Sequence, residues 1–453
     1  MERFAEKYLL EWKDRKKRKP LIIRGARQTG KTHLIEKIGS LYFENIIKID
    51  FEFHVNLKDI FHIKDPVQIV NELSLYFDSK IAAGESLLFF DEIQECPEAI
   101  NSLRYFYEKM PDLHVIAAGS LLEFVLNDFP YSMPVGRIEF LYLNPMTFEE
   151  FLLALNPSLF EYINKWTLNE KISDVIHEKL AEMLRLYFFV GGMPEAVSSY
   201  VETQSLIDVQ RVQSSILTTM KNDFSKYGSK KQMDYLIQIM NYIPANLGRK
   251  IKYSNINKDV RSVTLKEALN LLCMSRLIHK INKSKANGAP LEAEISSNHI
   301  KPLFLDIGLV NNICGLNLTD YKELITVYEG SLAEQFIGQE LLNFGYFFED
   351  IKLHYWAREE KNSNAEIDYV IIQNNKVLPI EVKAGKTGSL KSLHLFLYEK
   401  KLQHAVRFNM DRPSIGKFKT NVRTKKVQDS VEFTLVSLPM YLVGRMCSLG
   451  ENN

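Results

Sequence analysis

Apolar residues gather in short runs along the first third of the chain, and amphipathic stretches separate these runs. The runs cover residues 21–23, 45–50, 87–90, 114–118 and 138–141. Each run is nearly continuous in apolar character, as expected of a strand that is covered on both faces. Such strands alternating with helices predict an α/β domain built on a parallel sheet.

A different pattern begins near residue 150, where apolar residues recur with helical spacing up to about residue 245. Gly191 and Gly192 interrupt this pattern just before Pro194 and indicate a helix boundary. Two short helices are predicted next, followed by two strands: 253–256, 262–269, 277–278 and 303–305. This order is typical of a winged-helix module, which reads DNA, docks a protein or serves as a nucleotide-sensing lid.

Alternation with period two marks a third region, over residues 365–372 and 378–384. Asn374 and Asn375 lie between these segments and predict a hairpin with a two-residue turn. The C-terminal part of the chain is therefore expected to contain an antiparallel strand pair.

The expected turn fixes which side chains of this hairpin share a face. It places Asp368 directly opposite Glu381, and Glu366 opposite Lys383. Side chains two residues apart point to the same side of a strand, so these four are expected to lie together. The residues between them would face the core: Ile367, Tyr369, Ile380 and Val382.

Composition narrows the function classes only slightly. The 453 residues suffice for two to four domains, and 46% hydrophobic with 25% charged residues is ordinary for a globular protein. The net charge of +1 gives no general attraction to nucleic acid or anionic lipid, so local patches would have to provide it. The four cysteines are far apart, and neither a secretory segment nor a membrane-spanning run occurs. We expect a cytoplasmic protein with reduced thiols and no membrane partner.

The strand at 21–23 leads into a complete phosphate-binding motif, G-x-x-x-x-G-K-[ST]. Its residues, expected to bind ATP, are Gly25, Ala26, Arg27, Gln28, Thr29, Gly30, Lys31 and Thr32. A strand, a glycine-containing loop and a helix in this order direct backbone N–H groups and the helix dipole at a polyphosphate. In such a loop, Lys31 would contact the β- and γ-phosphates and the Thr32 hydroxyl would ligate Mg²⁺.

Two carboxylates end the strand at 87–90. Asp91 and Glu92 would lie at the carboxyl end of a parallel strand, where α/β sheets bind their ligands. Asp91 is expected to bind Mg²⁺, and Glu92 to orient or deprotonate the attacking water. About 60 residues after a phosphate loop, this pair supports phosphoryl transfer.

Two further residues are candidates for contacts with the γ-phosphate. Ser120 follows the strand at 114–118 and could touch the γ-phosphate or the water, but it equally fits a helix cap. Arg137 precedes the strand at 138–141 and could act as an arginine finger, within the chain or from a neighbouring copy. A structural ion pair is the alternative role for Arg137.

Together these segments resemble a family of bacterial and archaeal AAA-like P-loop ATPases. The resemblance rests on residues 25–32, 91–92, 119–120, 136–137, 143–151 and 190–196, the last matching a Gly-Gly-x-Pro-Glu segment of the family. It implies an AAA-like fold, ATP binding with Mg²⁺, a winged helix in the middle of the chain and a C-terminal domain of unknown function.

The predicted hairpin carries a second candidate site. Opposed carboxylates repel each other, so a cation such as Mg²⁺ is expected between Asp368 and Glu381. Lys383 could then position or activate a water for phosphodiester hydrolysis. The hairpin resembles the restriction-endonuclease-like PD-(D/E)xK core, and Glu334 matches the helical glutamate that often precedes it. Ile367 stands where that motif has proline, so a domain that has lost nuclease activity is the open alternative.

These observations predict three regions: an AAA-like P-loop ATPase domain at 1–160, a helical and winged-helix region at 161–320, and a restriction-endonuclease-like domain at 321–453. Two functions are compatible with them. The first is an ATPase whose nucleotide state controls a nuclease-like domain that cuts or binds DNA. The second is a nucleotide-dependent switch or scaffold, with an inactive C-terminal domain, that binds a protein partner or assembles as a homo-oligomer.

Overall fold

The computed structural model of the protein describes residues 1–120, 122, 136–168, 170–224, 229–315, 324–358, 365–384, 390–423 and 428–446. The chain divides into two compact units. The first comprises Met1–Pro145, Met274–Leu277 and Gly345–Asp350. The second comprises Met146–Cys273, Ile278–Phe344 and Ile351–Asn453.

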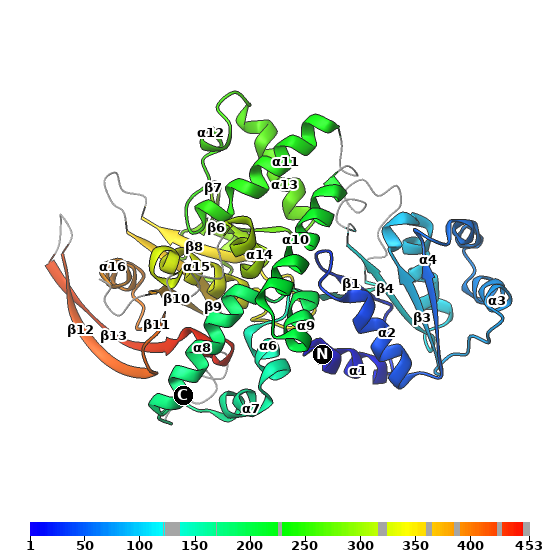
Figure 1. The fold of residues 1–453 in the computed structure, drawn as a ribbon, viewed down its shortest axis with the longest axis horizontal. Helices are drawn as coiled ribbons and strands as arrows, with labels where there is room; N and C mark the ends of the chain where they lie inside the picture. The colour runs from blue at the N-terminus through cyan, green and yellow to red at the C-terminus, as the bar shows by residue number, and fades with distance from the viewer. Residues whose placement is uncertain are drawn as a thin grey trace. The chain divides into compact units, whose positions relative to one another are not determined.

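The first unit is built on the expected parallel sheet (Figure 1). Its strands are β1 (Leu21–Arg24), β2 (Asn45–Asp50), β3 (Ser86–Asp91), β4 (His114–Gly119) and β5 (Glu139–Tyr142), in the order β2-β3-β4-β1-β5. All neighbouring strands run parallel. Its helices are α1 (Ala5–Asp14), α2 (Lys31–Tyr42), α3 (Pro66–Tyr76) and α4 (Pro97–Lys109), with 3-10 turns η1 (Val55–Ile63) and η2 (Ile93–Glu95).

Two apolar clusters cover the two faces of this sheet. On one face, α1 and α2 pack Trp12 and Ile35 against strand residues such as Ile116. On the other face, α3 and α4 pack residues such as Leu103 against Phe90. Burial on both faces explains why the strands are nearly continuous apolar runs in the sequence, and the prediction of a parallel α/β sheet is confirmed.

Two short segments from late in the chain complete the first unit. The carbonyl of Phe347 accepts a hydrogen bond from the N–H of Tyr142 at the end of β5 (2.7 Å). Arg276 forms an ion pair with Asp350 (3.0 Å) and lies 4.6 Å from the ring centroid of Tyr142. The carboxyl end of β5 is therefore covered by residues that lie more than 100 positions downstream.

Among the residues that the structure describes, the second unit contains ten helices between residues 148 and 341. They are α6 (Phe148–Leu155), α7 (Pro157–Lys165), α8 (Asp174–Val190), α9 (Pro194–Thr203), α10 (Leu206–Asp223), α11 (Lys230–Tyr242), α12 (Tyr253–Ile256), α13 (Ser262–Met274), α14 (Ile307–Ile313) and α15 (Leu324–Leu341). The short 3-10 turns are η4 (Pro244–Asn246), η5 (Leu291–Glu294) and η7 (Met440–Arg445). The predicted helical region is thus confirmed, including the boundary at Gly191 and Gly192.

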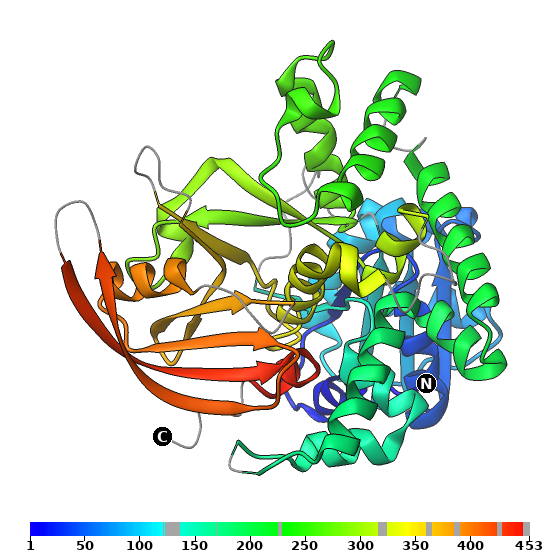
Figure 2. The ribbon, with the colours of Figure 1, turned by 60° about the vertical axis from the view of Figure 1, so that its left-hand side comes forward.

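An eight-stranded mixed sheet forms the rest of this unit (Figure 2). Its strands are β6 (Ile278–Ser284), β7 (Ile295–Phe304), β8 (Leu353–Ala357), β9 (Glu366–Gln373), β10 (Lys376–Val382), β11 (His404–Asn409), β12 (Ser414–Arg423) and β13 (Gln428–Pro439), in the order β12-β13-β11-β10-β9-β8-β6-β7. Helix α16 (Lys391–Lys400) packs Leu393, Phe396 and Leu397 against it.

The predicted β-wing is part of this larger sheet. Strands β6 and β7 pair antiparallel, as a wing would, but β6 also pairs with β8 through Ile281 and Leu353. A hairpin with an unpaired edge is exposed to non-specific pairing, and the additional strand removes one such edge. The sheet therefore combines strands from both sides of residue 320, while the three-region division and the winged helix stay predictions.

The β9–β10 hairpin has the predicted register. Asn374 and Asn375 form its two-residue turn, with φ of +49° and +61°. The paired residues run from Lys376↔Gln373 to Ile380↔Tyr369. One further step in this register places Asp368 opposite Glu381. Pro379 lies in this central strand opposite Val370 without shifting the register.

The Gly-Gly-x-Pro-Glu segment has a structural role in this unit. Gly191 has φ of +75°, and a Cβ at this position would lie 2.2 Å from Asp306 Oδ1. Gly192 donates its N–H to Asp306 Oδ2 (2.6 Å), while Asp306 caps α14 through the N–H of Leu309 (3.1 Å). The buried Asp306 carboxylate thus links the α8–α9 turn to α14.

No described helix combines the length and the apolarity that a membrane crossing requires.

Candidate functional site

The phosphate-binding motif forms a tight loop between β1 and α2. Gln28 and Gly30 have φ of +63° and +86°, which turns the chain sharply before α2 begins at Lys31. A Cβ on Gly25 would lie 2.2 Å from the carbonyl oxygen of Leu143, so only glycine fits there. The Thr29 hydroxyl donates to the carbonyl of Ala26 (3.0 Å) inside the loop. The N-terminal turn of α2 therefore faces the loop, as anion binding requires.

The Lys31 ammonium lies inside this loop. Its Nζ donates to the carbonyls of Gly25 (3.0 Å) and Ala26 (2.8 Å), and the residue is buried. Burial lowers the pKa of Lys31 to about 8, although Glu92 and Asp91 act to raise it. A buried ammonium of this kind gains from a polyanion beside it, because the phosphates would favour its charged form.

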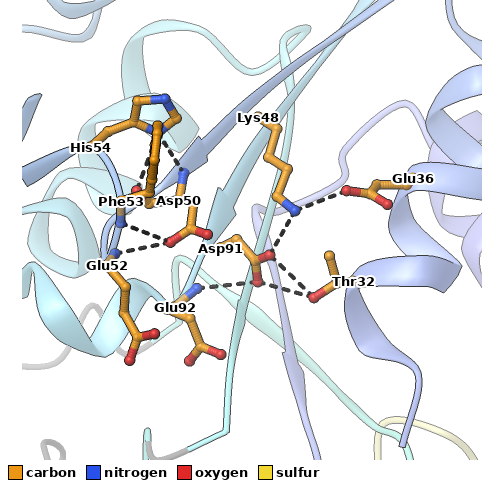
Figure 3. A network of polar contacts seen from close by, with 9 residues as sticks. All are labelled: Thr32, Glu36, Lys48, Asp50, Glu52, Phe53, His54, Asp91 and Glu92. Carbon is orange, nitrogen blue, oxygen red and sulfur yellow. Dashed lines mark hydrogen bonds and ion pairs between the residues drawn. The ribbon is translucent and has the colours of Figure 1, made fainter. Parts of the chain in front are cut away.

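Thr32 and Asp91 meet at the carboxyl edge of the sheet (Figure 3). The Thr32 hydroxyl donates to Asp91, with Oγ1 at 3.1 Å from Oδ2 and 3.3 Å from Oδ1. Asp91 is buried, and burial raises its pKa despite the opposing effect of Lys48. A hydroxyl and a carboxylate are oxygen donors of the type that Mg²⁺ prefers, so these two residues fit the expected metal.

Glu92 follows in a left-handed backbone conformation, with φ of +47°. Its Oε2 accepts hydrogen bonds from Gln94 Nε2 (2.6 Å) and from the Ser120 hydroxyl (3.5 Å). Glu92 and Ser120 thus belong to one polar group at the ends of β3 and β4. The alternative role of Ser120 as a helix cap concerns residues that are mostly outside the described part of the chain.

The structure places Arg137 at the opposite edge of the sheet. Residue 139 begins β5, and its N–H bonds to the carbonyl of Pro20, just before β1. Arg137 therefore lies near the amino ends of the strands, whereas the phosphate loop follows the carboxyl end of β1. Its Nε forms an ion pair with Glu108 Oε1 (3.3 Å), with 45% of its side chain exposed. Within one chain, Arg137 is not brought to Lys31.

Two cations at this site were not predicted from the sequence. Lys48 on β2 bridges Asp91 and Glu36, at 3.1 and 2.8 Å (Figure 3). Arg3 donates to the carbonyls of Thr29 (3.0 Å) and Asn144 (2.8 Å) and so supports the loop from the N-terminus. One sign of Lys48 was present in the sequence, because a charged residue is unusual in the middle of the apolar run 45–50. No motif marks Arg3.

The C-terminal candidate residues gather around β9 and β10. The Val382 N–H donates to Asp368 Oδ2 (2.8 Å), and Lys383 forms an ion pair with Glu381 Oε1 (2.6 Å). Glu381 Oε2 is buried and accepts no hydrogen bond from the described residues. Burial, reinforced by Asp368, raises the pKa of Glu381 to about 7. Burial also raises the pKa of Asp368.

Lysines already neutralise part of this carboxylate group. Lys301 on β7 is buried and lies 2.6 Å from Glu366 Oε1 and 3.6 Å from Glu334 Oε2. Lys250 contacts the other oxygen of Glu366 (2.7 Å). Burial, with Asp368 next, raises the pKa of Glu334 to about 8. At Glu366 and Glu334, positive charge is therefore supplied by lysine side chains, whereas the cation expected between Asp368 and Glu381 stays a prediction.

The described residues contain no group of three His, Cys, Asp or Glu side chains placed to hold a metal ion. Mg²⁺ is often bound through one or two carboxylates with waters completing its shell. Asp368 and the unpartnered oxygen of Glu381 could provide these one or two carboxylates. A Mg²⁺ site between Asp368 and Glu381 is therefore a proposal.

A basic pocket of about 410 Å³ borders the same group. Its lining includes Arg249, Lys250, Lys252 and Glu366. Glu366 thus lies both in the pocket wall and in the carboxylate group. Among the described residues, Arg249 and Lys252 have no carboxylate within ion-pair distance.

Comparison with protein families assigns three segments. Residues 17–152 match an AAA domain, residues 181–320 match a domain of unknown function (DUF8612), and residues 329–427 match another (DUF4143). No curated protein matches the chain.

Solved structures include several distant likenesses. A Walker-type ATPase of Pyrococcus abyssi is 16% identical over 69% of this chain and 95% of its own, with a TM-score of 0.44. A signal-transduction ATPase with a tetratricopeptide repeat sensor, from Pyrococcus horikoshii, is 14% identical over 76% of this chain and 46% of its own, with a TM-score of 0.26. AMPPCP-bound DnaA from Aquifex aeolicus is 15% identical over 58% and 73%, with a TM-score of 0.23. At these scores the likenesses carry no functional conclusion. The matched family and the loop geometry agree that residues 17–152 form a domain similar to those of AAA-type P-loop ATPases.

Proposed function

We propose that the protein binds ATP with Mg²⁺ and hydrolyses it at the carboxyl edge of the five-stranded sheet. The hydrogen bond between Thr32 and Asp91 carries this proposal. It joins the start of α2 to the end of β3, so the residues expected for phosphate and metal binding converge although 59 positions separate them. The AAA domain match over residues 17–152 supports the same activity.

Different residues of the site would bind the phosphates and the metal ion. The N–H groups at the start of α2 would bind phosphate oxygens, and Lys31 would exchange the carbonyls of Gly25 and Ala26 for the β- and γ-phosphates. Mg²⁺, held by Thr32 and Asp91, would supply neutralisation of phosphate charge.

Glu92 would orient the attacking water and take its proton. Gln94 and Ser120 fix its carboxylate, and Ser120 would contact the γ-phosphate side of the site. The strained backbone of Glu92 is typical of residues that a fold holds in place for function.

Arg137 enters this proposal only through a second copy of the chain. Arg137 pairs with Glu108 and lies at the amino edge of the sheet, so it does not reach the phosphate loop of its own chain. An arginine finger from Arg137 would therefore require a homo-oligomer in which this edge faces the site of a neighbour.

For the C-terminal region we propose a restriction-endonuclease-like domain, controlled by nucleotide state, that cuts or binds DNA. The opposed Asp368 and Glu381, with Lys383 beside them, support this proposal. The basic pocket lined by Arg249 and Lys252 supports a phosphodiester backbone as the ligand, because cations with no carboxylate beside them among the described residues attract phosphates.

One observation favours a domain that does not cut. Lys301 and Lys250 neutralise Glu366, and Lys301 also approaches Glu334, so fewer carboxylate charges remain for a metal. The alternative is accordingly a nucleotide-dependent switch or scaffold that binds a protein partner through an inactive C-terminal domain. Ile367, which stands where the motif has proline, agrees with this alternative.

ATP hydrolysis measured for the wild type and Glu92→Gln tests the first proposal, with and without double- and single-stranded DNA. Mg²⁺-dependent hydrolysis that the variant loses is the expected result, and equal rates for both proteins would overturn it. Stimulation by DNA, or cleavage that Asp368→Asn abolishes, supports the nuclease-like function. Hydrolysis indifferent to DNA, without cleavage, supports the switch.

A further inference from the structure

A lysine ammonium lies on the carboxylate that is expected to bind Mg²⁺. Lys48 Nζ is 3.1 Å from Asp91 Oδ2, the same oxygen that accepts the Thr32 hydroxyl at 3.1 Å. Figure 3 shows Lys48 and Thr32 converging on Asp91 from β2 and α2. This arrangement follows from the sheet order, because β2 is the direct neighbour of β3. Two positive charges on one carboxylate repel each other, so Lys48 and a divalent cation compete for Asp91.

Glu36 provides a second place for the same ammonium. Its Oε1 lies 2.8 Å from Lys48 Nζ, and its side chain is more exposed than that of Asp91, at 47% against 9%. Lys48 itself is 32% exposed, so solvent gives its long side chain room to move. The other charged groups that act on Asp91 are Glu92, which is adjacent in sequence, and Lys31.

We propose that Lys48 is a positioning residue that sets the Mg²⁺ requirement for nucleotide binding. It neutralises Asp91 and fixes its carboxylate toward Thr32, and it moves its charge toward Glu36 when magnesium nucleotide binds. Glu36 therefore favours metal binding, although it would not be a ligand itself. This inference rests on the proposed ATP site and adds a determinant of its metal affinity that lies outside the phosphate loop.

The test measures binding rather than turnover. A fluorescent ATP analogue is mixed with the full-length chain, and its bound fraction is followed while MgCl₂ is titrated at constant ionic strength. In Lys48→Met the Mg²⁺ concentration at half-maximal binding should fall about fivefold or more, because the competing cation is gone. In Glu36→Gln it should rise about threefold, because Lys48 has only Asp91 left.

A neighbouring ion pair provides matched controls. Lys37 on the same helix as Glu36 pairs with Glu6 of α1 at 2.7 Å. Lys37→Met and Glu6→Gln make the same changes of charge away from Asp91. Both should keep the wild-type Mg²⁺ midpoint, which separates competition at Asp91 from a general effect of net charge.

The outcomes are distinct. Opposite shifts in Lys48→Met and Glu36→Gln, absent from the controls, support the proposal. Unchanged midpoints, or shifts in the same direction, would overturn it, and Glu36→Gln decides alone if Lys48→Met does not fold. Failure of the proposed ATP site would look different: the wild type would bind the analogue no better than Lys31→Ala at any Mg²⁺ concentration.

Discussion

Thr32 at the start of α2 donates its hydroxyl to Asp91 at the end of β3, with 3.1 Å between Oγ1 and Oδ2. The contact joins the phosphate loop to the end of β3, where Asp91 is the last strand residue and Glu92 follows it. Because the hydroxyl and not the methyl group makes this contact, the two parts of the threonine side chain can be separated by mutation.

Thr32→Val keeps the shape of the side chain and removes the oxygen. We expect kcat/KM for ATP to fall on the order of 100-fold, since a metal ligand and a hydrogen bond to Asp91 are lost together. Thr32→Ser retains the oxygen and should remain within about fivefold of the wild type. Steady-state hydrolysis at saturating Mg²⁺ measures both, and a Thr32→Val enzyme as active as Thr32→Ser would contradict the assigned role.

The parts of the site that could be predicted are those fixed by local sequence. The motif at 25–32 determines its own loop, and Asp91 follows because carboxyl ends of parallel strands share one edge. The position of Arg137 also follows from this rule, because a residue before a parallel strand lies at the amino edge. Of the two forms of the arginine-finger hypothesis, this geometry disfavours the one within a single chain, and the form with a neighbouring copy stays a prediction.

The residues that could not be predicted depend on which strands become neighbours. Lys48 reaches Asp91 only because β2 lies beside β3, and Lys301 reaches Glu366 only because β7 joins the C-terminal sheet through β6 and β8. No periodicity encodes a strand order. The β9–β10 register could be predicted because a two-residue turn leaves a single pairing.

That turn gives the second prediction. Asn375 has φ of +61°, a conformation that a β-branched side chain adopts only at a cost. Asn375→Val should therefore lower the free energy of unfolding by about 1–2 kcal/mol, whereas Asn375→Gly should not lower it measurably. Urea unfolding monitored by fluorescence compares the two variants. Equal stability of the valine and glycine variants would show that this turn does not determine the hairpin.

His114 predicts a pH dependence of stability in the first unit. Its Nε2 lies 3.1 Å from the carbonyl of Lys13, and its Nδ1 lies 3.3 Å from the guanidinium of Arg18. Burial, with the Arg18 charge next, lowers the pKa of His114 to about 4, against the weaker opposing effect of Asp14. The folded protein thus keeps a neutral imidazole where the unfolded chain already binds a proton.

The sign follows from this difference in proton binding. Stability from His114 is complete above its unfolded value of 6.5 and is lost as the pH falls toward about 4, by up to about 3 kcal/mol. His114→Gln should show a shallower loss than the wild type between pH 6.5 and 4. His62→Gln makes the same substitution at an exposed position and serves as the control. Unfolding free energies at several pH values measure the difference between the proteins. Parallel curves for wild type and His114→Gln would be incompatible with a neutral buried His114.

The carboxylates of β9 and β10 give the last prediction, which also separates the two proposed functions. Glu381 is buried and Asp368 is partly buried in the same register, and burial, reinforced by Asp368, raises the pKa of Glu381 to about 7. Asp368→Asn removes one charge but can still accept the Val382 N–H, so it should stabilise the protein by about 1 kcal/mol at neutral pH.

If the pair binds Mg²⁺, the ion should raise the melting temperature of the wild type by roughly 2–4 °C and leave that of Asp368→Asn unchanged. Because Mg²⁺ is also proposed to bind at Asp91, both proteins carry Thr32→Val in this experiment. A wild-type hairpin that gains nothing from Mg²⁺ would favour the switch, since Lys301, Lys250 and Lys383 would then supply all the positive charge that the carboxylates require.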